Sequence, residues 1–180
     1  MNLMNATDIF LKRKNELEEE YKSLVEKPNM PIKEFNNGIF TRYQNPVLTN
    51  QHIPLEWKFD FNPESNPYFL ERIGFNAAFN AGAIKYKGKY LLCARIEGND
   101  RKSFFAIAES NNGIDHFKFW DKPCIIPQIE GNPDTNAYDM RLVQHEDGWI
   151  YGIFCTERKD PNAPAGDTSS AIANAGIVRT

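Results

Sequence analysis

One carboxylate in this sequence stands where folding alone gives little reason for it. Asp139 lies inside a strand-like run, between Tyr138 and Met140. Aspartate is depleted in strands because its short polar side chain favours turns. A carboxyl group placed this way can deliver a proton to a leaving group. Asp139 is therefore the first candidate for a catalytic role.

Two arginines follow apolar runs further along the chain. Arg158 comes soon after the strand-like run that ends at Thr156, and Arg179 ends the run 175–178. A guanidinium group carries a fixed charge and forked N–H donors that match phosphate oxygens. An acid beside arginines fits the transfer of a glycosyl group to phosphate. The simpler alternative is that these charged residues lie in loops and contact only solvent.

Other motifs that carry chemistry are missing from the sequence. His52, His116 and His145 do not have the spacing of metal ligands, and no GxSxG, Walker A or dinucleotide-binding glycine pattern occurs. The polar segments at 95–101 and 156–160 lie at the ends of predicted strands and in the connecting loops. Loops carried on a rigid sheet are where functional sites usually lie. We therefore predict no metal and no cofactor.

Composition and charge exclude several classes of function. The 180 residues are 41% hydrophobic and carry a net charge of −3, which suits a soluble globular protein and gives no basic field for nucleic acid or acidic membranes. Residues 1–5 have no basic or apolar leader, and no run is long enough to span a bilayer. Three cysteines without CxxC spacing predict reduced thiols and a cytoplasmic location.

The N-terminal segment, residues 1–28, predicts one helix. Thr7 or Asp8 would cap it, and it would run to about Lys27 because Pro28 cannot continue a helix. One face carries apolar residues at helical spacing, namely Phe10, Leu17, Tyr21 and Leu24. This face packs either on its own domain or on another subunit. Because a lone helix ahead of a β-domain often needs a partner, we expect a homo-oligomer assembled through the helix.

Residues 29–180 predict one β-domain. Segment 28–75 reads as long ordered loops with short strands, and strands follow at 83–86, 89–95, 104–110 and 117–120. A second round has strands at 138–145 and 149–155, and 176–180 aligns with the third strand of the first round. Units of four antiparallel strands are typical of propeller blades. Two blades cannot close a ring, so we expect a fragment of a longer chain, with a small two-sheet protein as the alternative.

Four segments resemble the opening part of glycoside hydrolase family 130. They are GFNAAFNAGA at 74–83, ARIEGNDRKS at 94–103, AYDMR at 137–141 and AGIVRT at 175–180. The resemblance implies an all-β, five-bladed propeller with its site on the central axis, of which this chain would hold about two blades plus an N-terminal helix.

The resemblance also implies roles for particular residues. Asp139 matches the single general acid of the family, and Arg158 and Arg179 match phosphate-binding arginines. Arg95 and Asp100 fall in the motif that lines the mannose subsite, and Asn80 is expected there too. Many relatives have Glu-Asp-Pro-Arg where this chain has Tyr-Asp-Met-Arg at 138–141, a departure that we interpret as a subfamily difference.

The implied activity is the inverting phosphorolysis of β-1,4-mannosyl-glucose to α-mannose 1-phosphate and glucose. Inorganic phosphate would be a co-substrate rather than a cofactor. An inverting hydrolase needs two carboxylates, whereas phosphate is already a charged nucleophile, so one acid suffices. Phosphorolysis of mannobiose or of mannooligosaccharides is an alternative within the family. A non-catalytic carbohydrate-binding propeller fragment is the alternative outside it.

Overall fold

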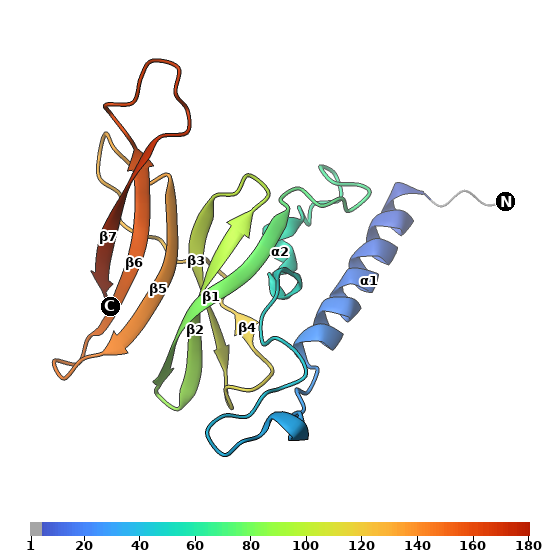
Figure 1. Cartoon of the computed structure of the whole chain (residues 1–180). Helices are drawn as coiled ribbons and strands as arrows, with labels where there is room; N and C mark the ends of the chain where they lie inside the picture. Colours follow the sequence, from blue (N-terminus) through green and yellow to red (C-terminus); the bar gives the residue numbers. More distant parts are fainter. Residues whose placement is uncertain (1–4) are drawn as a thin grey trace.

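Two antiparallel sheets stand side by side, and a long helix lies beyond the first of them (Figure 1). The computed structural model describes residues 5–180. The first sheet has the order β1-β2-β3-β4, and the second has the order β5-β6-β7. Their bounds are β1 Phe75–Tyr86, β2 Lys89–Gly98, β3 Ser103–Ser110, β4 Lys118–Phe119, β5 Asn136–Gln144, β6 Ile150–Lys159 and β7 Ala171–Arg179.

Tight turns fix the hairpins that the sequence predicted. Lys87 and Gly88 both have positive φ, at 47° and 81°, and this pair of conformations matches the twist of the flanking strands. Gly148, at φ 88°, turns β5 into β6. Several strands are longer than predicted, whereas β4 covers only Lys118–Phe119 of the strand predicted at 117–120. β1 begins at Phe75 rather than at residue 83, and β6 runs through Arg158 to Lys159.

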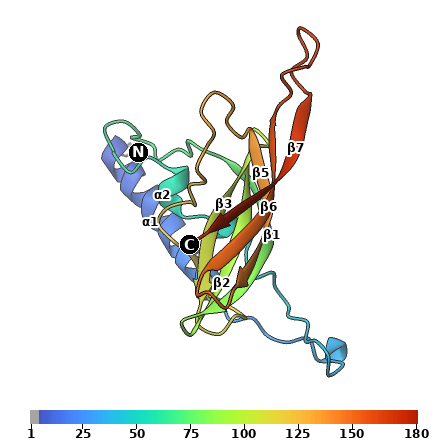
Figure 2. The same ribbon diagram turned by 90° about the vertical axis from the view of Figure 1, so that its left-hand side faces the viewer.

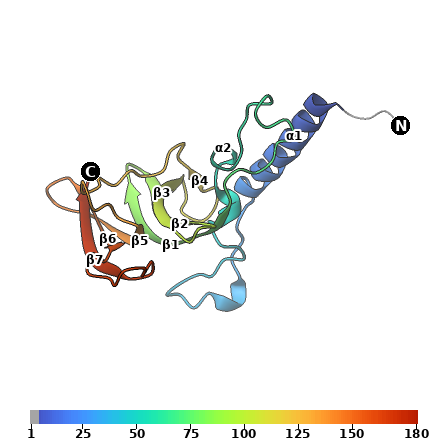
Figure 3. The same ribbon diagram turned by 90° about the horizontal axis from the view of Figure 1, so that it is seen from above.

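Strand β1 of the first sheet and β5 of the second run next to each other. Gly82 makes this possible, because a Cβ atom there would lie 2.4 Å from the carbonyl oxygen of Met140. A buried cluster between the sheets contains Cys93, Phe105, Ala137, Met140 and Phe154. The view from above shows the two sheets as neighbouring layers (Figure 3). They do not form a closed ring, so the five-bladed propeller stays a prediction.

The segment between the helix and β1 covers the first sheet near its β4 edge. It holds three short helices, η1 Lys33–Phe35, η2 Asn50–His52 and α2 Leu55–Lys58. Trp57 of α2 lies against Phe104 and Phe119, with ring centroids 6.2 and 6.1 Å apart. The short strands predicted for residues 28–75 are wrong: apart from the first residue of β1, only isolated bridges occur there, because side-chain packing and turns order this segment instead. Around residues 36–42 a loop projects away from the sheets (Figure 2).

Helix α1, Ala6–Val25, packs on its own chain. Asn5 caps it by accepting a hydrogen bond from the Asp8 amide at 2.8 Å, so the predicted cap at Thr7 or Asp8 is wrong by a few residues. Phe10 is buried, and Leu17 and Tyr21 are partly buried against the same cluster. No helix within residues 5–180 is long and apolar enough to cross a membrane. Cys93, Cys124 and Cys155 are free thiols.

Phe69 is the centre of the cluster that holds α1. Its ring stacks on Phe59 at 4.8 Å and meets Phe10 and Phe61 edge-on, each at 5.1 Å. The residue is fully buried, and its carbonyl oxygen accepts a hydrogen bond from Arg13 Nε. A single side chain thus joins the helix to the segment that leads into β1.

We predict that Phe69→Ala lowers the free energy of unfolding by about 3–5 kcal/mol, because it leaves a cavity among three aromatic rings. Urea denaturation followed by far-ultraviolet circular dichroism measures the change. Tyr68→Ala is the matched control, since Tyr68 is 53% exposed. Equal losses in the two variants would contradict the central position of Phe69.

Candidate active site at the junction of the two sheets

Two β-bulges face each other where β1 meets β5. The register of β1 shifts between Phe79 and Gly82, and that of β5 shifts between Tyr138 and Arg141. Each bulge holds one non-glycine residue with positive φ, Asn80 at 47° and Asp139 at 62°. This left-handed region is uncommon for residues with a side chain, although asparagine and aspartate tolerate it best. Bulges re-aim side chains, and here they aim an amide and a carboxyl group.

Direct hydrogen bonds join the two bulges. Asn80 Nδ2 donates to Asp139 Oδ1 at 3.0 Å. In the opposite direction, Arg141 Nη1 donates to the main-chain oxygen of Asn80 at 2.9 Å. Met140, between the two residues on β5, is buried against Cys93, with 3.5 Å between the sulfur atoms. The carboxyl group of Asp139 is therefore held from β1 while its strand is anchored from behind.

A clamped arginine lies beside Asp139. The guanidinium of Arg95 on β2 sits 4.7 Å from the ring centroid of Phe79 and 4.8 Å from that of Tyr138. Its Nη1 lies 3.6 Å from Asp139 Oδ1, and its side chain is only 17% exposed, against 39% for Asp139. Stacking between two rings restricts the guanidinium. The site thus combines a fixed cation with an acid that a substrate can reach.

Glu97 and Glu157 belong to the same network, and sequence reasoning missed both. Glu97 lies 3.3 Å from Arg95 Nη2, and Ser103 accepts from Arg95 Nε at 2.9 Å. Tyr138 donates its hydroxyl proton to Glu157 Oε1 at 2.6 Å, and this bond raises the pKa of Tyr138 above its ordinary value. The alternation of β2, which puts Glu97 two residues after Arg95 on the same face, was the available signal.

Asp100 lies outside this network. It sits in the turn between β2 and β3, where its Oδ1 accepts from the Lys102 amide at 3.0 Å. The carboxylate thus caps its own turn, a common use of aspartate. Of the residues expected at the mannose subsite, the structure joins Asn80 and Arg95 to Asp139 and leaves Asp100 apart from them.

Arg158 lies inside β6 and pairs with Asp134. Its Nε donates to Asp134 Oδ1 at 2.8 Å. Burial works to raise the pKa of Asp134, but hydrogen bonds from Thr156 and Arg158 outweigh it and lower the pKa. The terminal amino groups of Arg158 make no hydrogen bond within residues 5–180. They remain available to an anion.

The structure does not bring Arg158 and Arg179 together. Arg179 lies opposite Tyr151, whereas Arg158 lies opposite Ile172. Tyr151 and Arg158 are seven positions apart on β6, or roughly 23 Å along the strand. Since an odd spacing also reverses the face, the two guanidinium groups point to opposite sides. Arg179 lies 4.6 Å from the Trp149 ring centroid instead.

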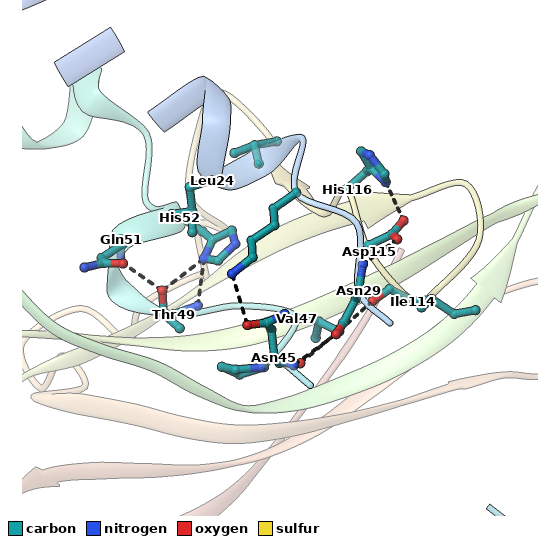
Figure 4. A pocket seen from close by; sticks show the side chains of 13 residues that line it. Leu24, Asn29, Asn45, Val47, Thr49, Gln51, His52, Ile114, Asp115 and His116 are labelled. Atoms are coloured by element: carbon teal, nitrogen blue, oxygen red, sulfur yellow. Dashed lines mark hydrogen bonds and ion pairs between the residues drawn. The ribbon is translucent and has the colours of Figure 1, made fainter. Parts of the chain in front are cut away.

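A separate pocket of about 230 Å³ lies at the end of α1 (Figure 4). Its groups bond one another: the Thr49 amide donates to His52 Nδ1 at 3.1 Å, and Lys27 Nζ donates to Asn45 Oδ1 at 3.3 Å. The Lys27–Asn45 bond ties the chain just after the helix to a neighbouring loop, and the Thr49–His52 bond is internal to the η2 segment. Among residues 5–180, no group of three His, Cys, Asp or Glu side chains is placed to hold a metal ion.

Comparisons with solved structures return glycoside hydrolases at low similarity. A putative glycoside hydrolase from Parabacteroides distasonis is 17% identical over 89% of this chain and 41% of that chain, with a TM-score of 0.48. A structure described under the GH130 family of mannoside phosphorylases is 20% identical over 76% of this chain and 36% of that chain, with a TM-score of 0.49. No family model matches the sequence.

A curated relative is far more similar. The 4-O-β-D-mannosyl-D-glucose phosphorylase of Bacteroides fragilis is 59% identical over 160 residues, which make up 89% of this chain. The chain spans 40% of the length of that relative. Over almost all of its own length, the chain is therefore a homologue of a 4-O-β-D-mannosyl-D-glucose phosphorylase.

Proposed function

We propose that this chain supplies the general acid and part of the mannose subsite of a glycoside phosphorylase. The enzyme would convert β-1,4-mannosyl-glucose and phosphate to α-mannose 1-phosphate and glucose. The observation that carries the proposal is Asp139, which Asn80 and Arg95 hold by the same oxygen atom at the junction of the sheets. The 59% identity to a phosphorylase supports the same reaction.

Asp139 acts as the acid in the proposed reaction. Its carboxylic proton passes to the mannose 3-hydroxyl, which hands its own proton to the glycosidic oxygen. The bond between the anomeric carbon and that oxygen then breaks, and glucose leaves. A phosphate oxygen attacks the anomeric carbon from the opposite face, which inverts its configuration. One carboxyl group is sufficient, because phosphate needs no base to become a nucleophile.

We propose Arg158 as the phosphate-holding residue. Its Nε–Asp134 bond orients the guanidinium and leaves the outer fork for an oxyanion. We leave Arg179 out of this role, since it lies opposite Tyr151, at the end of β6 remote from Arg158 and from the Tyr138–Glu157 pair. Arg95 and Asn80, which already contact the acid, border the mannose. Their polar groups favour hydroxyl-rich ligands.

We extend the proposal to the whole fold. The two sheets would be neighbouring blades of a five-bladed propeller, with β1 and β5 as the strands nearest its axis. The site at the β1–β5 junction fits that position (Figure 1). Mannobiose and longer mannosides are the alternative substrates, and product analysis with each of them separates the cases. Saturable mannoside binding without turnover would instead favour a carbohydrate-binding protein.

We also propose that the protein works in the cytoplasm as a homo-oligomer. Leu11 on α1 is 49% exposed, and Ile39 and Phe40 in the projecting loop at 36–42 are 90% and 57% exposed. Apolar side chains left in solvent are typical of surfaces that pair. Light scattering of the intact protein should return a multiple of its chain mass, and a single chain mass would disprove the assembly.

We predict that Asp139→Asn lowers kcat by about 10²–10⁴-fold, because an amide cannot deliver the proton. The measurement is phosphate-dependent release of glucose from β-1,4-mannosyl-glucose by the intact protein. Asp160→Asn is the control, since Asp160 only caps an exposed turn at Asn162. Full activity of Asp139→Asn would remove Asp139 from the mechanism.

A second prediction separates the two arginines. Arg158→Ala should raise KM for phosphate by roughly 10–100-fold, which is the loss expected when a charged hydrogen-bond donor is removed. Arg179→Ala should leave KM for phosphate unchanged. Initial rates at varied phosphate concentration give both values. The opposite ranking would show that Arg179 holds the phosphate.

A further inference from the structure

Asn80 occupies a backbone conformation that asparagine adopts at a cost. Its φ of 47° lies in the left-handed region, where most residues with a Cβ atom are disfavoured. Asn80 is also exposed, so no packing of its side chain explains the conformation. Strain of this kind persists where the surrounding structure imposes it, and it clusters at functional sites. The partner bulge repeats the feature at Asp139.

Both the side-chain amide and the main-chain oxygen of Asn80 form hydrogen bonds with residues of β5. The side-chain amide donates to Asp139 Oδ1 at 3.0 Å, and the main-chain oxygen accepts from Arg141 Nη1 at 2.9 Å. The left-handed backbone is what lets one residue present both groups to the neighbouring sheet. Arg141 is thereby drawn into the site, although its guanidinium contacts backbone rather than the acid.

The contacts on Asp139 fall on one oxygen. Asn80 Nδ2 lies 3.0 Å from Oδ1, and Arg95 Nη1 lies 3.6 Å from the same atom. Within residues 5–180, Oδ2 makes no hydrogen bond. An oxygen that accepts from an amide and faces a cation is the poorer site for a proton, so the proton of the neutral acid belongs on Oδ2.

We propose that Asn80 is a positioning residue for Asp139: its strained backbone presents an amide donor to Oδ1 and so leaves Oδ2 as the oxygen that transfers the proton. Arg141 supports it by fixing the main chain of Asn80. The inference rests on the proposed function, because it takes Asp139 as the acid. It extends that function by giving Asn80 a task that a mere contact with mannose does not include.

The strain is tested by thermal unfolding of glycine variants. Asn80→Gly should leave Tm unchanged or raise it, because glycine adopts positive φ freely and offsets the lost exposed hydrogen bond. Asn174→Gly is the matched control: Asn174 is exposed on β7, and its φ is not positive. There glycine should lower Tm by about 2 °C. An equal fall in both variants would overturn the inference.

Positioning is tested without turnover by NMR. The Hα–Hβ scalar couplings of Asp139 should report one χ1 rotamer in the natural chain and in Asn174→Gly. They should report averaged rotamers in Asn80→Gly and Asn80→Ala. A fixed Asp139 rotamer in both Asn80 variants would refute the proposal. Since no substrate is used, this outcome is independent of whether the protein is a phosphorylase.

Activity then shows the consequence of the positioning. In the intact protein, Asn80→Gly should lower kcat by about 10-fold or more and change KM for the mannoside less. A rise in KM with unchanged kcat would show that Asn80 only binds sugar, and it would also overturn the inference. If the natural protein has no phosphorolytic activity, the proposed function fails while the NMR result still decides the role of Asn80.

Discussion

The close approach of β1 to β5 is the constraint on which the site depends. Gly82 allows it, because any larger residue would meet the Met140 carbonyl oxygen. At this separation the two bulges reach each other, so Asn80 and Asp139 form a hydrogen bond between different sheets. The buried contacts of Met140 and Phe154 with the first sheet keep the separation fixed. The chemistry thus depends on packing behind the strands as much as on the polar groups in front of them.

The charged groups of the site surround the guanidinium of Arg95. Two rings clamp the guanidinium, Asp139 and Glu97 share its charge, and Glu157 restrains Tyr138 from the far side. A cation that is held in place before the substrate arrives needs no reorganisation during the reaction. Tyr138 therefore contributes one ring to this clamp.

Local signals in the sequence predicted the parts of this structure that depend on neighbouring residues. The turn at Lys87 and Gly88 and the in-strand carboxylate at Asp139 could be recognised from residue type alone. The bulge at Asn80 could not, because an extra residue breaks the period of two and β1 then looks like a loop. Arg158 and Arg179 look equivalent in sequence. Only the register of β6 and β7 shows that they lie at opposite ends and on opposite faces.

The measurement that tests the central claim most directly is combined ³¹P and ¹H NMR of the intact protein with β-1,4-mannosyl-glucose and inorganic phosphate. The account predicts growth of α-mannose 1-phosphate in step with free glucose, and no glucose release when phosphate is left out. Free mannose in place of the phosphate ester, or no consumption of the disaccharide, would contradict it. Free mannose would indicate hydrolysis. An unconsumed disaccharide would mean that there is no reaction in which Asp139 acts as the acid.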